Sequence, residues 1–396
     1  MLRSILLPGI SSLRSTSWWR SWIDWQRPEL SEMYNEDNEP KRQNPGPPAG
    51  AAGPDMAPPV TVIILNYNGR ELLERCLAAV VSQTYPHYRV LLVDNASHDG
   101  SVAFVRERFT EVQILETGSN LGYAGGNNAG VAAAETDYVV LLNNDTVVAP
   151  GWLAALVRAA EPEGVAAVAS MVRTAGVAER YYERNGSINL LGHNVMRVFR
   201  DPRELFYPGG TALLYKRSLL PDPPFDPLYF AYGEDVFLGL RARFAGHEVV
   251  MAREAQVEHV GGATATDTLR PWLATLQERN RLLNLLIFFG GGTIVRAMPL
   301  VVAGALAKLT LAILTQRFRL GALLRAYGWL LVHPGAIHAR RRRWRRSRRV
   351  GDAAVLARMS ARVSNGESHG GRWANRVAIA YARLVRLPLI ETGDQP

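Results

Sequence analysis

The sequence has one cysteine, Cys76, among its 396 residues. A single thiol cannot form an internal disulfide, which excludes the small secreted domains that depend on a disulfide framework. Cys76 lies between Arg75 and Leu77 in a helical pattern. This position favours a buried, packed thiol over a catalytic nucleophile.

Outside one short arginine-rich segment, positive and negative charges nearly balance. The formal net charge is +9, but eight arginines lie within Arg340 to Arg349, so the rest of the chain carries only +1. A nucleic-acid-binding domain spreads lysine and arginine over its reading face, so this distribution argues against a nucleic-acid partner. A concentrated basic cluster suits anionic lipid headgroups or a diphosphate-bearing lipid.

The N-terminal region lacks both a signal-peptide core and apolar periodicity. The apolar run within Met1 to Ile10 is very short and ends in Pro8 and Gly9, so we expect no cleaved leader. Residues 1–58 continue with four tryptophans and a Pro/Gly/Ala-rich stretch typical of a linker. The tryptophans suit a membrane interface, and a poorly ordered leader is an equal alternative.

From Val60 onward, short apolar β-branched runs alternate with helical patterns. We expect strands at 60–65, 88–93, 112–115 and 138–142, separated by helices at 70–82, 101–109 and one ending near 134. This alternation predicts an α/β fold with a mostly parallel central sheet and helices on both faces. Ligands of such sheets bind at the carboxyl ends of the strands.

Polar residues follow three of these predicted strands. They are Asn66 and Asn68, then Asp94 and Asn95, then Asn143, Asn144 and Asp145. Asparagine and aspartate are also ordinary turn and cap residues, and any one of these loops could be explained in that way. That explanation is weaker when three successive strand ends carry them. We therefore expect one polar site at this edge of the sheet.

Asp145 and His259 are the candidate metal ligands. Asp145 directly follows a buried strand, and a carboxylate suits Mg²⁺ or Mn²⁺ together with phosphate oxygens. His259 ends a short strand expected at 256–260 and precedes two glycines. A lone histidine is usually structural, but at a strand end beside two glycines and downstream of an acidic pair, metal ligation is an equal alternative.

The segment Asn120 to Asn128 is a glycine-rich turn that leads into a helix. Small residues allow backbone to approach a ligand closely, and a helix N-terminus favours anions. The first strand is not followed by Gly-x-Gly-x-x-Gly, so a dinucleotide-binding oxidoreductase is only a minor alternative.

An acidic pair, Glu234 and Asp235, opens a predicted helix after the aromatic loop 225–232. Acids at a helix start often only complement the helix dipole. An aromatic loop of this kind lines sugar-binding clefts, and a carboxylate beside it can act as a general base.

The ordered series of motifs resembles the family 2 inverting glycosyltransferases of the GT-A fold, and among them the bacterial rhamnosyltransferase-like branch. The resemblance covers roughly residues 59–281. It rests on Val62 to Gly69, Val93 to Ser97, Asn120 to Tyr123, Leu142 to Asp145, Gly209-Gly210, Gly233 to Asp235, and His259.

The resemblance implies a role for each of these motifs. Asp235 is the general base, with Glu234 beside it, and Asp145 and His259 hold a divalent cation, Mg²⁺ or Mn²⁺. The implied donor-binding residues are Asn66, Asn68, Asp94, Asn95, Asn120, Gly122, Asn127 and Asn144, and those lining the sugar or acceptor are Gly209, Gly210 and Tyr232.

The chain departs from the family pattern at three points. Asn143 and Asn144 precede a single Asp145 where two acids are common, which puts metal affinity in doubt. Asn95 replaces a second acid after the second strand, so nucleotide preference is open. The Gln-x-x-Arg-Trp signature of processive synthases is absent, because Gln277 is followed by Glu278, Arg279, Asn280 and Arg281. We therefore expect one transfer per encounter.

The C-terminal region is apolar, helical and basic. Helical patterns at 282–289, 298–315 and 320–332 precede the arginine cluster, and Lys308 interrupts the longest. We expect this region to lie on an anionic membrane surface or, equally, to pack as a bundle on the catalytic domain. The predicted regions are 1–58, 59–281 and 282–396.

The sequence thus predicts a cytoplasmic enzyme placed peripherally at the inner face of the cell membrane. It would transfer a hexose, with rhamnose as one option, from a dTDP- or UDP-linked donor to a glycan or lipid-linked saccharide in cell-envelope polysaccharide synthesis. A catalytically silent nucleotide-sugar-binding or scaffold protein is the alternative. A nucleotidyltransferase is weaker, because no basic phosphate loop follows the first strand.

Overall fold

The computed structural model describes residues 57–174, 186–195, 201–260, 270–315, 318–365 and 368–391. Almost all of the predicted leader, residues 1–56, therefore lies outside the described residues, as do the two glycines after His259. All of the predicted site residues are described. They belong to one compact unit, Ala57–Pro396.

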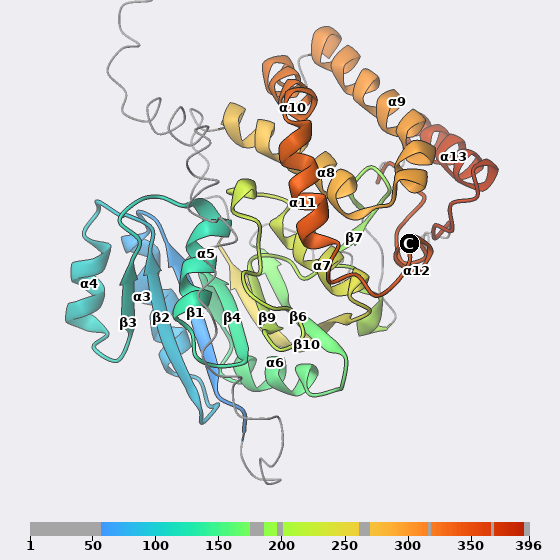
Figure 1. The fold of residues 1–396 in the computed structure, drawn as a ribbon. Coiled ribbons are helices and arrows are strands. Elements are labelled where there is room, and N and C mark those ends of the chain that lie inside the picture. Colours follow the sequence, from blue (N-terminus) through green and yellow to red (C-terminus); the bar gives the residue numbers. More distant parts are fainter. Residues whose placement is uncertain are drawn as a thin grey trace, which may run out of the picture. The chain divides into compact units, whose positions relative to one another are not determined.

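Eight strands form one sheet in the order β3-β2-β1-β4-β9-β6-β10-β5 (Figure 1). Their bounds are Val60–Asn66 (β1), Tyr88–Asp94 (β2), Gln113–Glu116 (β3), Tyr138–Asn143 (β4), Thr146–Val148 (β5), Val165–Thr174 (β6), Ala212–Lys216 (β9) and Glu248–His259 (β10). The strands from β3 to β4 are all parallel, whereas β9 and β5 run antiparallel to their neighbours. The prediction of a mostly parallel sheet is confirmed.

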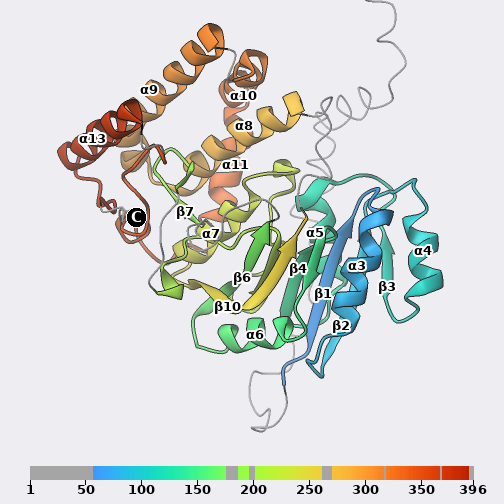
Figure 2. The same ribbon diagram turned by 180° about the vertical axis from the view of Figure 1, so that it is seen from behind.

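Helices cover both faces of this sheet, as Figure 2 shows from behind. They are α3 (Arg70–Val81), α4 (Ser101–Arg108), α5 (Gly122–Ala133), α6 (Trp152–Ala160) and α7 (Glu234–Phe244). Successive residues of β1 point to opposite faces, so Val62 packs with Leu77 of α3 while Ile63 packs in the cluster that contains Val131 of α5. Two apolar cores result, one on each side.

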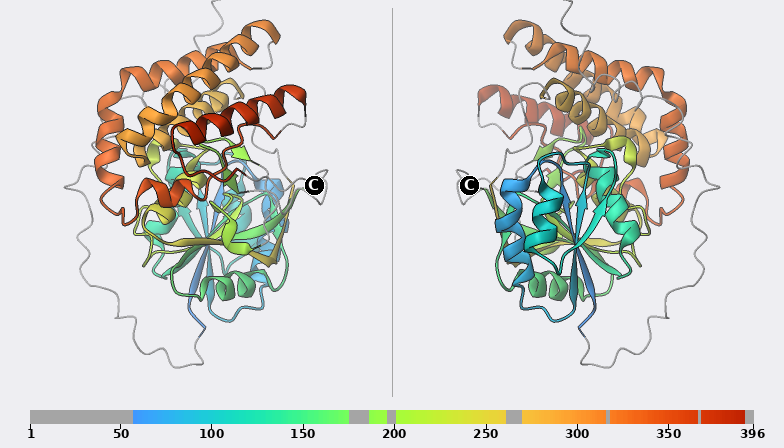
Figure 3. Two further views of the ribbon diagram at one scale, coloured as in Figure 1. Left: turned by 90° about the vertical axis from the view of Figure 1, so that its right-hand side faces the viewer. Right: turned by 90° about the vertical axis from the view of Figure 1, so that its left-hand side faces the viewer.

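Six further helices follow β10 among the described residues. They are α8 (Arg270–Phe288), α9 (Gly291–Thr315), α10 (Leu320–Val332), α11 (Pro334–Trp344), α12 (Asp352–Leu356) and α13 (His369–Leu384). They gather on the α7 side of the sheet (Figure 3). The predicted boundary between residues 281 and 282 falls inside α8.

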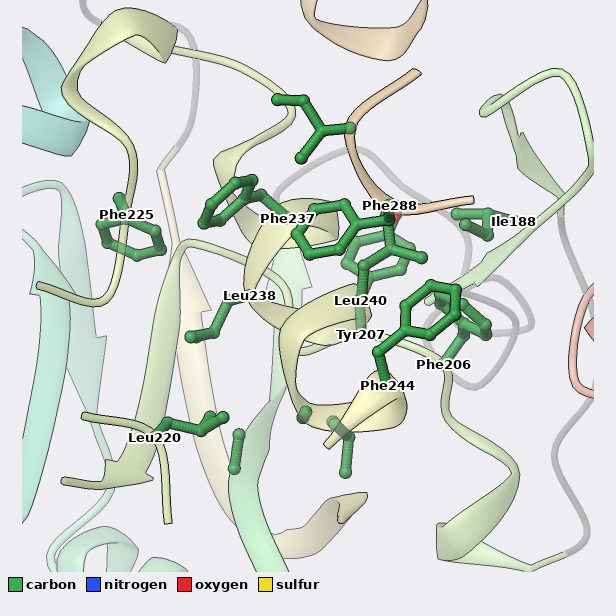
Figure 4. Packing of buried hydrophobic residues seen from close by; sticks show 14 of the residues in the cluster. Ile188, Phe206, Tyr207, Leu220, Phe225, Phe237, Leu238, Leu240, Phe244 and Phe288 are labelled. Carbon is green, nitrogen blue, oxygen red and sulfur yellow. The ribbon is translucent and has the colours of Figure 1, made fainter. Parts of the chain in front are cut away.

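An aromatic cluster joins α7 to these helices. The Phe237 ring lies 5.1 Å from the Tyr229 ring, 5.1 Å from the Phe288 ring and 5.0 Å from the Trp344 ring, all edge to face. Figure 4 shows Phe237 and Phe288 meeting beside Phe244. Because these rings belong to one buried core, α8 and α11 are packed directly on the helix that begins at Glu234.

Two predicted elements differ from the observed ones. The strand expected at 256–260 is the last part of β10, whose pairing with β6 shifts register between Ala252 and Gln256. The turn expected over Asn120 to Asn128 is helical from Gly122. Positions 126 and 130 leave no room for a side chain. A Cβ on Gly126 would stand 2.4 Å from Leu65, and a Cβ on Gly130 would stand 2.8 Å from Ile63.

A buried ion-pair network joins α8, α9 and α10. Glu278 accepts from Lys308 Nζ at 2.6 Å, from the Tyr327 hydroxyl at 2.8 Å and from the Arg281 guanidinium. Burial alone would raise the pKa of Glu278, but Arg281 and Lys308 outweigh it and hold that pKa at about 2. The one lysine of α9 therefore points into the protein.

Replacing Glu278 with glutamine should destabilise the fold, because Arg281 and Lys308 would face a neutral amide inside the protein. We expect a loss of about 3–5 kcal/mol in the free energy of unfolding, measured by denaturant titration. The matched control is Glu254→Gln, which removes an exposed ion pair with Arg158 and should cost less than about 1 kcal/mol. Equal losses in both variants would contradict a stabilising role for the network.

Candidate functional site

Asn66 links three strand ends at the carboxyl edge of the sheet. Its Nδ2 donates to Asp94 Oδ1 at 3.1 Å, and its Oδ1 accepts from Asn144 Nδ2 at 2.7 Å. A Cβ on Gly69 would stand 2.1 Å from Asn144 Nδ2, so position 69 has to be glycine for this contact to form. Asn66 is fully buried. The convergence expected of these loops is therefore present.

Asp94 and Asn95 are buried and bonded within the protein. Asp94 Oδ2 accepts from the Ser97 amide at 2.9 Å. Asn95 Nδ2 donates to Asn120 Oδ1 at 3.0 Å, and its Oδ1 accepts from the Leu121 amide at 3.0 Å. Asn95 therefore ties the second strand end to the loop before α5.

The start of α5 is docked against the aromatic loop. Gly122 has a φ of +70°, and a Cβ there would stand 2.5 Å from the Phe230 ring. The Ala124 amide donates to the Phe230 carbonyl at 3.0 Å, and the Gly122 amide donates to Asn120 Oδ1 at 2.9 Å. Two of the amides at this helix start are therefore already bonded.

Exposure differs among the other predicted donor residues. Asn68 and Asn120 are exposed. Asn127 is buried, and its Oδ1 has no hydrogen-bond partner although its Nδ2 donates to the Tyr123 carbonyl at 2.9 Å. A buried acceptor without a partner costs folding free energy, which makes Asn127 a candidate ligand contact.

Asp145 and His259 meet because β5 pairs with the end of β10. His259 lies opposite Thr146 in that antiparallel ladder, and the Val260 amide donates to the Asp145 carbonyl at 3.0 Å. The His259 Nε2 and Asp145 Oδ2 atoms are 3.1 Å apart. Asp145 Oδ1 is buried and has no partner. Two residues 114 positions apart thus form one polar pair.

The chemistry of this pair fits a divalent cation. A carboxylate oxygen and an imidazole nitrogen are both ligands of divalent cations, and the two side chains present them 3.1 Å apart. The free Asp145 Oδ1 supplies a further lone pair. Within the described residues, no group of three or more His, Cys, Asp or Glu side chains is placed to hold an ion. The remaining positions would fall to phosphate oxygens and water.

Cys76 lies beneath this pair and is buried, as the sequence predicts. Its Sγ is 3.7 Å from the Asn143 carbonyl oxygen, and burial raises its pKa to about 12. A buried, protonated thiol is a poor nucleophile at neutral pH. Cys76 is a packing residue of α3 that lies against the end of β4.

Asp235 lies beside Gly210 and Tyr123. An ideal Cβ on Gly210 would stand 3.3 Å from the Tyr123 hydroxyl and 3.8 Å from Asp235 Cβ. The Tyr123 hydroxyl donates to the Gly210 carbonyl at 2.5 Å. A side chain at position 210 would therefore intrude between the start of α5 and Asp235. Gly209 is open, with no atom within 4 Å of its ideal Cβ.

Burial raises the pKa of both acids at the start of α7. The pKa of Asp235 rises to about 6, although backbone amides of Val236 and Gly210 lower it in part. Burial, and then the neighbouring Asp235, raise the pKa of Glu234 well above its ordinary value. Glu234 Oε2 is buried without a partner, whereas Asp235 is partly exposed. A partly exposed carboxyl with a pKa near 6 can accept a proton near neutral pH.

One backbone connection relates the metal pair to the acidic pair. The Asn143 amide at the end of β4 donates to the Thr211 carbonyl at 2.9 Å. Asp145 follows Asn143 by two residues, and Gly210 precedes Thr211. The same sheet edge therefore carries Asp145 on one side of this bond and the Gly210–Asp235 contact on the other.

Two asparagines of α8, which the sequence interpretation missed, hold the loop before α7. Asn280 Nδ2 donates to the carbonyls of Tyr229, Ala231 and Tyr232 at 2.9, 3.1 and 2.7 Å. Asn284 Nδ2 donates to the Gly233 carbonyl at 3.0 Å. The loop includes positive φ values at Phe230, Tyr232 and Gly233. These amide donors stabilise an otherwise strained backbone.

The arginine cluster supports the same loop. Asp226, at the start of the loop, accepts from Trp344 Nε1 at 3.0 Å, and Arg340 Nε lies 3.0 Å from the same carboxylate. Other arginines of the cluster line a hollow of about 510 Å³, namely Arg341, Arg342, Arg345, Arg348 and Arg349, together with His338 and Val350. Part of the predicted basic tail is thus structural, and part faces solvent.

Comparison with known proteins is consistent with this geometry. The glycosyl transferase family 2 model matches residues 61–222. The N-acetylglucosaminyl-diphospho-decaprenol L-rhamnosyltransferase of Mycobacterium tuberculosis is 30% identical over 237 residues, covering 52% of this chain and 76% of that protein. Glycosyltransferase AglE of Haloferax volcanii is 28% identical over 206 residues, covering 50% of this chain and 65% of that protein.

Among solved structures, GalNAc-T7 with UDP, GalNAc and Mn²⁺ superposes with a TM-score of 0.50 at 14% identity. The match covers 71% of this chain and 59% of that one. The fold is therefore that of the GT-A glycosyltransferases. The chain belongs to glycosyl transferase family 2 and is a glycosyltransferase.

Replacing Asn280 with aspartate keeps the side chain's shape but removes its amide donors. We expect kcat to fall at least about tenfold while KM for the donor changes little, because three loop carbonyls each lose a donor and the Asp235 loop loses its position. The matched control is Asn375→Asp, which removes a buried amide donor to the Ser364 carbonyl in the C-terminal region. An equal fall in kcat in the control would show a general loss of stability.

Proposed function

We propose that this glycosyltransferase transfers a sugar from a nucleoside-diphosphate donor to a hydroxyl of the acceptor with inversion of the anomeric centre. The observation that carries the proposal is the shared sheet edge: Asp145 and His259 form a polar pair there, and Asp235 lies beside Gly210 across one backbone bond. A cation-binding pair and a base with a raised pKa are the groups that an in-line displacement of a nucleoside diphosphate requires.

Asp145 and His259 would hold the divalent cation, Mg²⁺ or Mn²⁺. When bound, the ion neutralises charge on the departing diphosphate. The buried Asp145 Oδ1 without a partner supports this assignment, as does the presence of Mn²⁺ with UDP in the GalNAc-T7 structure. The single carboxylate suits a weakly held ion that binds together with the donor.

Asp235 would accept the proton of the attacking hydroxyl. Its partial exposure and raised pKa support this role. Glu234 is buried behind it, and its raised pKa keeps negative charge off that position, so it would orient the loop or donate a hydrogen bond to the substrate. Gly209, Gly210 and Tyr232 would border the sugar.

The donor nucleotide would lie along the ends of β1, β2 and β4. Asn68 and Asn120 are exposed there, and Asn127 has the unsatisfied Oδ1. Asp94 and Asn95 would act by holding this edge together, since their side chains bond within the protein. We propose that the donor is a dTDP- or UDP-linked sugar.

The acceptor would be a glycan or a lipid-linked saccharide of the cell envelope. The mycobacterial relative is named for a diphospho-decaprenol acceptor, which supports a lipid-linked one. The hollow lined by arginines supplies positive charge for such a diphosphate and for anionic lipids. The enzyme would then work at the cytoplasmic face of the membrane as a peripheral protein.

The pH dependence of transfer tests the base. Asp235 accepts a proton only when ionised, and its pKa is raised to about 6, so kcat/KM should rise from pH 5 to pH 7 and then level off. Asp235→Asn should lower kcat by about 10²–10⁴-fold with donor affinity near normal, whereas Glu107→Gln on exposed α4 should change neither. An acidic limb near pH 4, or an active Asp235→Asn, would assign the base elsewhere.

Cation affinity tests the metal pair. Asp145→Asn and His259→Gln should each weaken Mn²⁺ binding at least about tenfold in the presence of a nucleoside diphosphate, measured by calorimetry. Asp99→Asn is the control, because this carboxylate at the same edge accepts from the Arg70 amide at 2.8 Å and is not part of the pair. If only Asp99→Asn lost affinity for Mn²⁺, the cation site would have to be assigned to Asp99 instead.

A further inference from the structure

The outward side of α9 is apolar and exposed. Val295, Leu306, Ile313 and Leu314 are 71%, 58%, 66% and 74% exposed. They recur at helical spacing with exposed Pro299 and Val302, so they form one stripe along the helix. A helix on the surface of a soluble domain normally presents polar side chains there. In α9 this arrangement is reversed.

The only charged residue between Ala297 and Thr315 points inward. Lys308 bonds to Glu278 of α8 at 2.6 Å, and its side chain is 17% exposed. The outward stripe over this stretch therefore contains no charge at all. A membrane, and not water, is the environment that suits such a surface.

The surroundings of α9 are strongly basic. Residues 279–390 contain twenty arginines and one lysine but only two acids, Asp352 and Glu367, whereas the rest of the chain has more acidic than basic residues. A partner for this region must therefore be apolar where it meets α9 and negatively charged around it. Bilayers with anionic lipids combine both properties.

α13 lies next to α9 (Figures 1 and 3). Arg296 of α9 donates to the Arg386 carbonyl at 3.2 Å, and the Tyr381 hydroxyl donates to the Arg296 carbonyl at 2.8 Å. Trp373 and Leu384 of α13 are 67% and 79% exposed. An exposed tryptophan among arginines is typical of a helix that lies at a membrane interface.

We propose that the outward stripe of α9, together with Trp373 and Leu384 of α13, docks on an anionic bilayer, with α9 lying in the plane of the interface. The proposal rests on the proposed peripheral placement of the enzyme and identifies the surface that makes the contact.

Length alone would allow another arrangement. By length and composition α9 is the one helix of the described residues that could cross a bilayer. Crossing would pull Lys308 away from Glu278. In α8, Glu278 precedes Asn280 by two residues and Asn284 by six, and these asparagines hold the loop before Asp235. The ion pair therefore favours an in-plane helix over a crossing one.

A second copy of the chain is a poorer occupant of this surface. Two copies would bring two arginine-rich regions together with almost no acids between them, and such repulsion opposes association. Fluorescence measured in the absence of vesicles distinguishes this outcome.

The experiment uses variants of the full chain that each carry one added cysteine besides Cys76. Native Cys76 is buried with a pKa of about 12, so maleimide probes should not label it. An environment-sensitive NBD label is placed at Val302, Leu306 or Ile313, and at exposed Glu107 of α4 as the control. Vesicles of phosphatidylcholine with phosphatidylglycerol should increase and blue-shift the fluorescence at the three α9 positions only. Pure phosphatidylcholine should give much less.

The depth of the labels in the bilayer distinguishes an α9 helix that lies in the interface from one that crosses the bilayer. Positions 302 and 313 are about 16 Å apart along a helix axis, so lipid-attached quenchers should report similar shallow depths for an in-plane helix and very different depths for a crossing one. Label depths that change steadily along α9, or fluorescence that does not respond to vesicles, would overturn the proposal. A blue shift that grows with protein concentration without vesicles would assign the surface to a second copy.

A charge variant completes the test. Leu306→Glu with Ile313→Glu should lower vesicle binding at least about tenfold and leave transfer to a soluble acceptor unchanged. Because docking is measured without substrate, a protein that docks but does not transfer would reject the proposed function alone. A protein that transfers but does not dock would reject this inference alone.

Discussion

Parallel pairing of β1 with both β2 and β4 is the constraint on which the site depends. It places Asn66 opposite Asp94 and Leu65 opposite Asn143, so three loops leave the sheet at one edge. The buried Asn66 side chain then fixes these loops to one another, and Gly69 leaves room for the contact. Asp145 is two residues beyond this pairing, and His259 reaches it through a separate antiparallel ladder.

The C-terminal helices are part of the same construction. Asn280 and Asn284 hold the loop that ends in Glu234 and Asp235, and Trp344 holds its beginning through Asp226. The helix that provides the asparagines also provides Glu278, which anchors α9. Membrane docking through α9 would therefore act on a bundle that is packed directly against the catalytic loop. In this arrangement the basic tail supports the site as well as facing the lipid.

Local sequence patterns were sufficient for the first half of the sheet. The expected strands at 60–65 and 88–93 end one residue before β1 and β2, because β-branched runs followed by asparagine, aspartate and glycine are strong local signals. β10 was only partly predicted, since exposed Arg253 and Glu254 lie at its register shift and interrupt the apolar pattern. The order of motifs then suggested the family, which the comparisons confirm.

Long-range contacts were beyond the reach of those patterns. Asn280 and Asn284 look like ordinary polar residues of an apolar helix, and only the tertiary fold shows which carbonyls they bond. The glycines of α5 suggested close approach to a ligand, whereas Gly126 and Gly130 admit Leu65 and Ile63 of the sheet. The predicted roles of the site residues remain predictions, although the structure brings Asp145 to His259 and Asp235 to Gly210.

The central claim is that residues distant in sequence meet around one cation at a single sheet edge. Anomalous diffraction from crystals grown with Mn²⁺ and a nucleoside diphosphate tests it most directly. The account predicts one strong manganese peak in contact with Asp145 and His259, with the diphosphate on the same side as Asp235. A peak at other residues, or a nucleotide bound away from the ends of β1, β2 and β4, would contradict it.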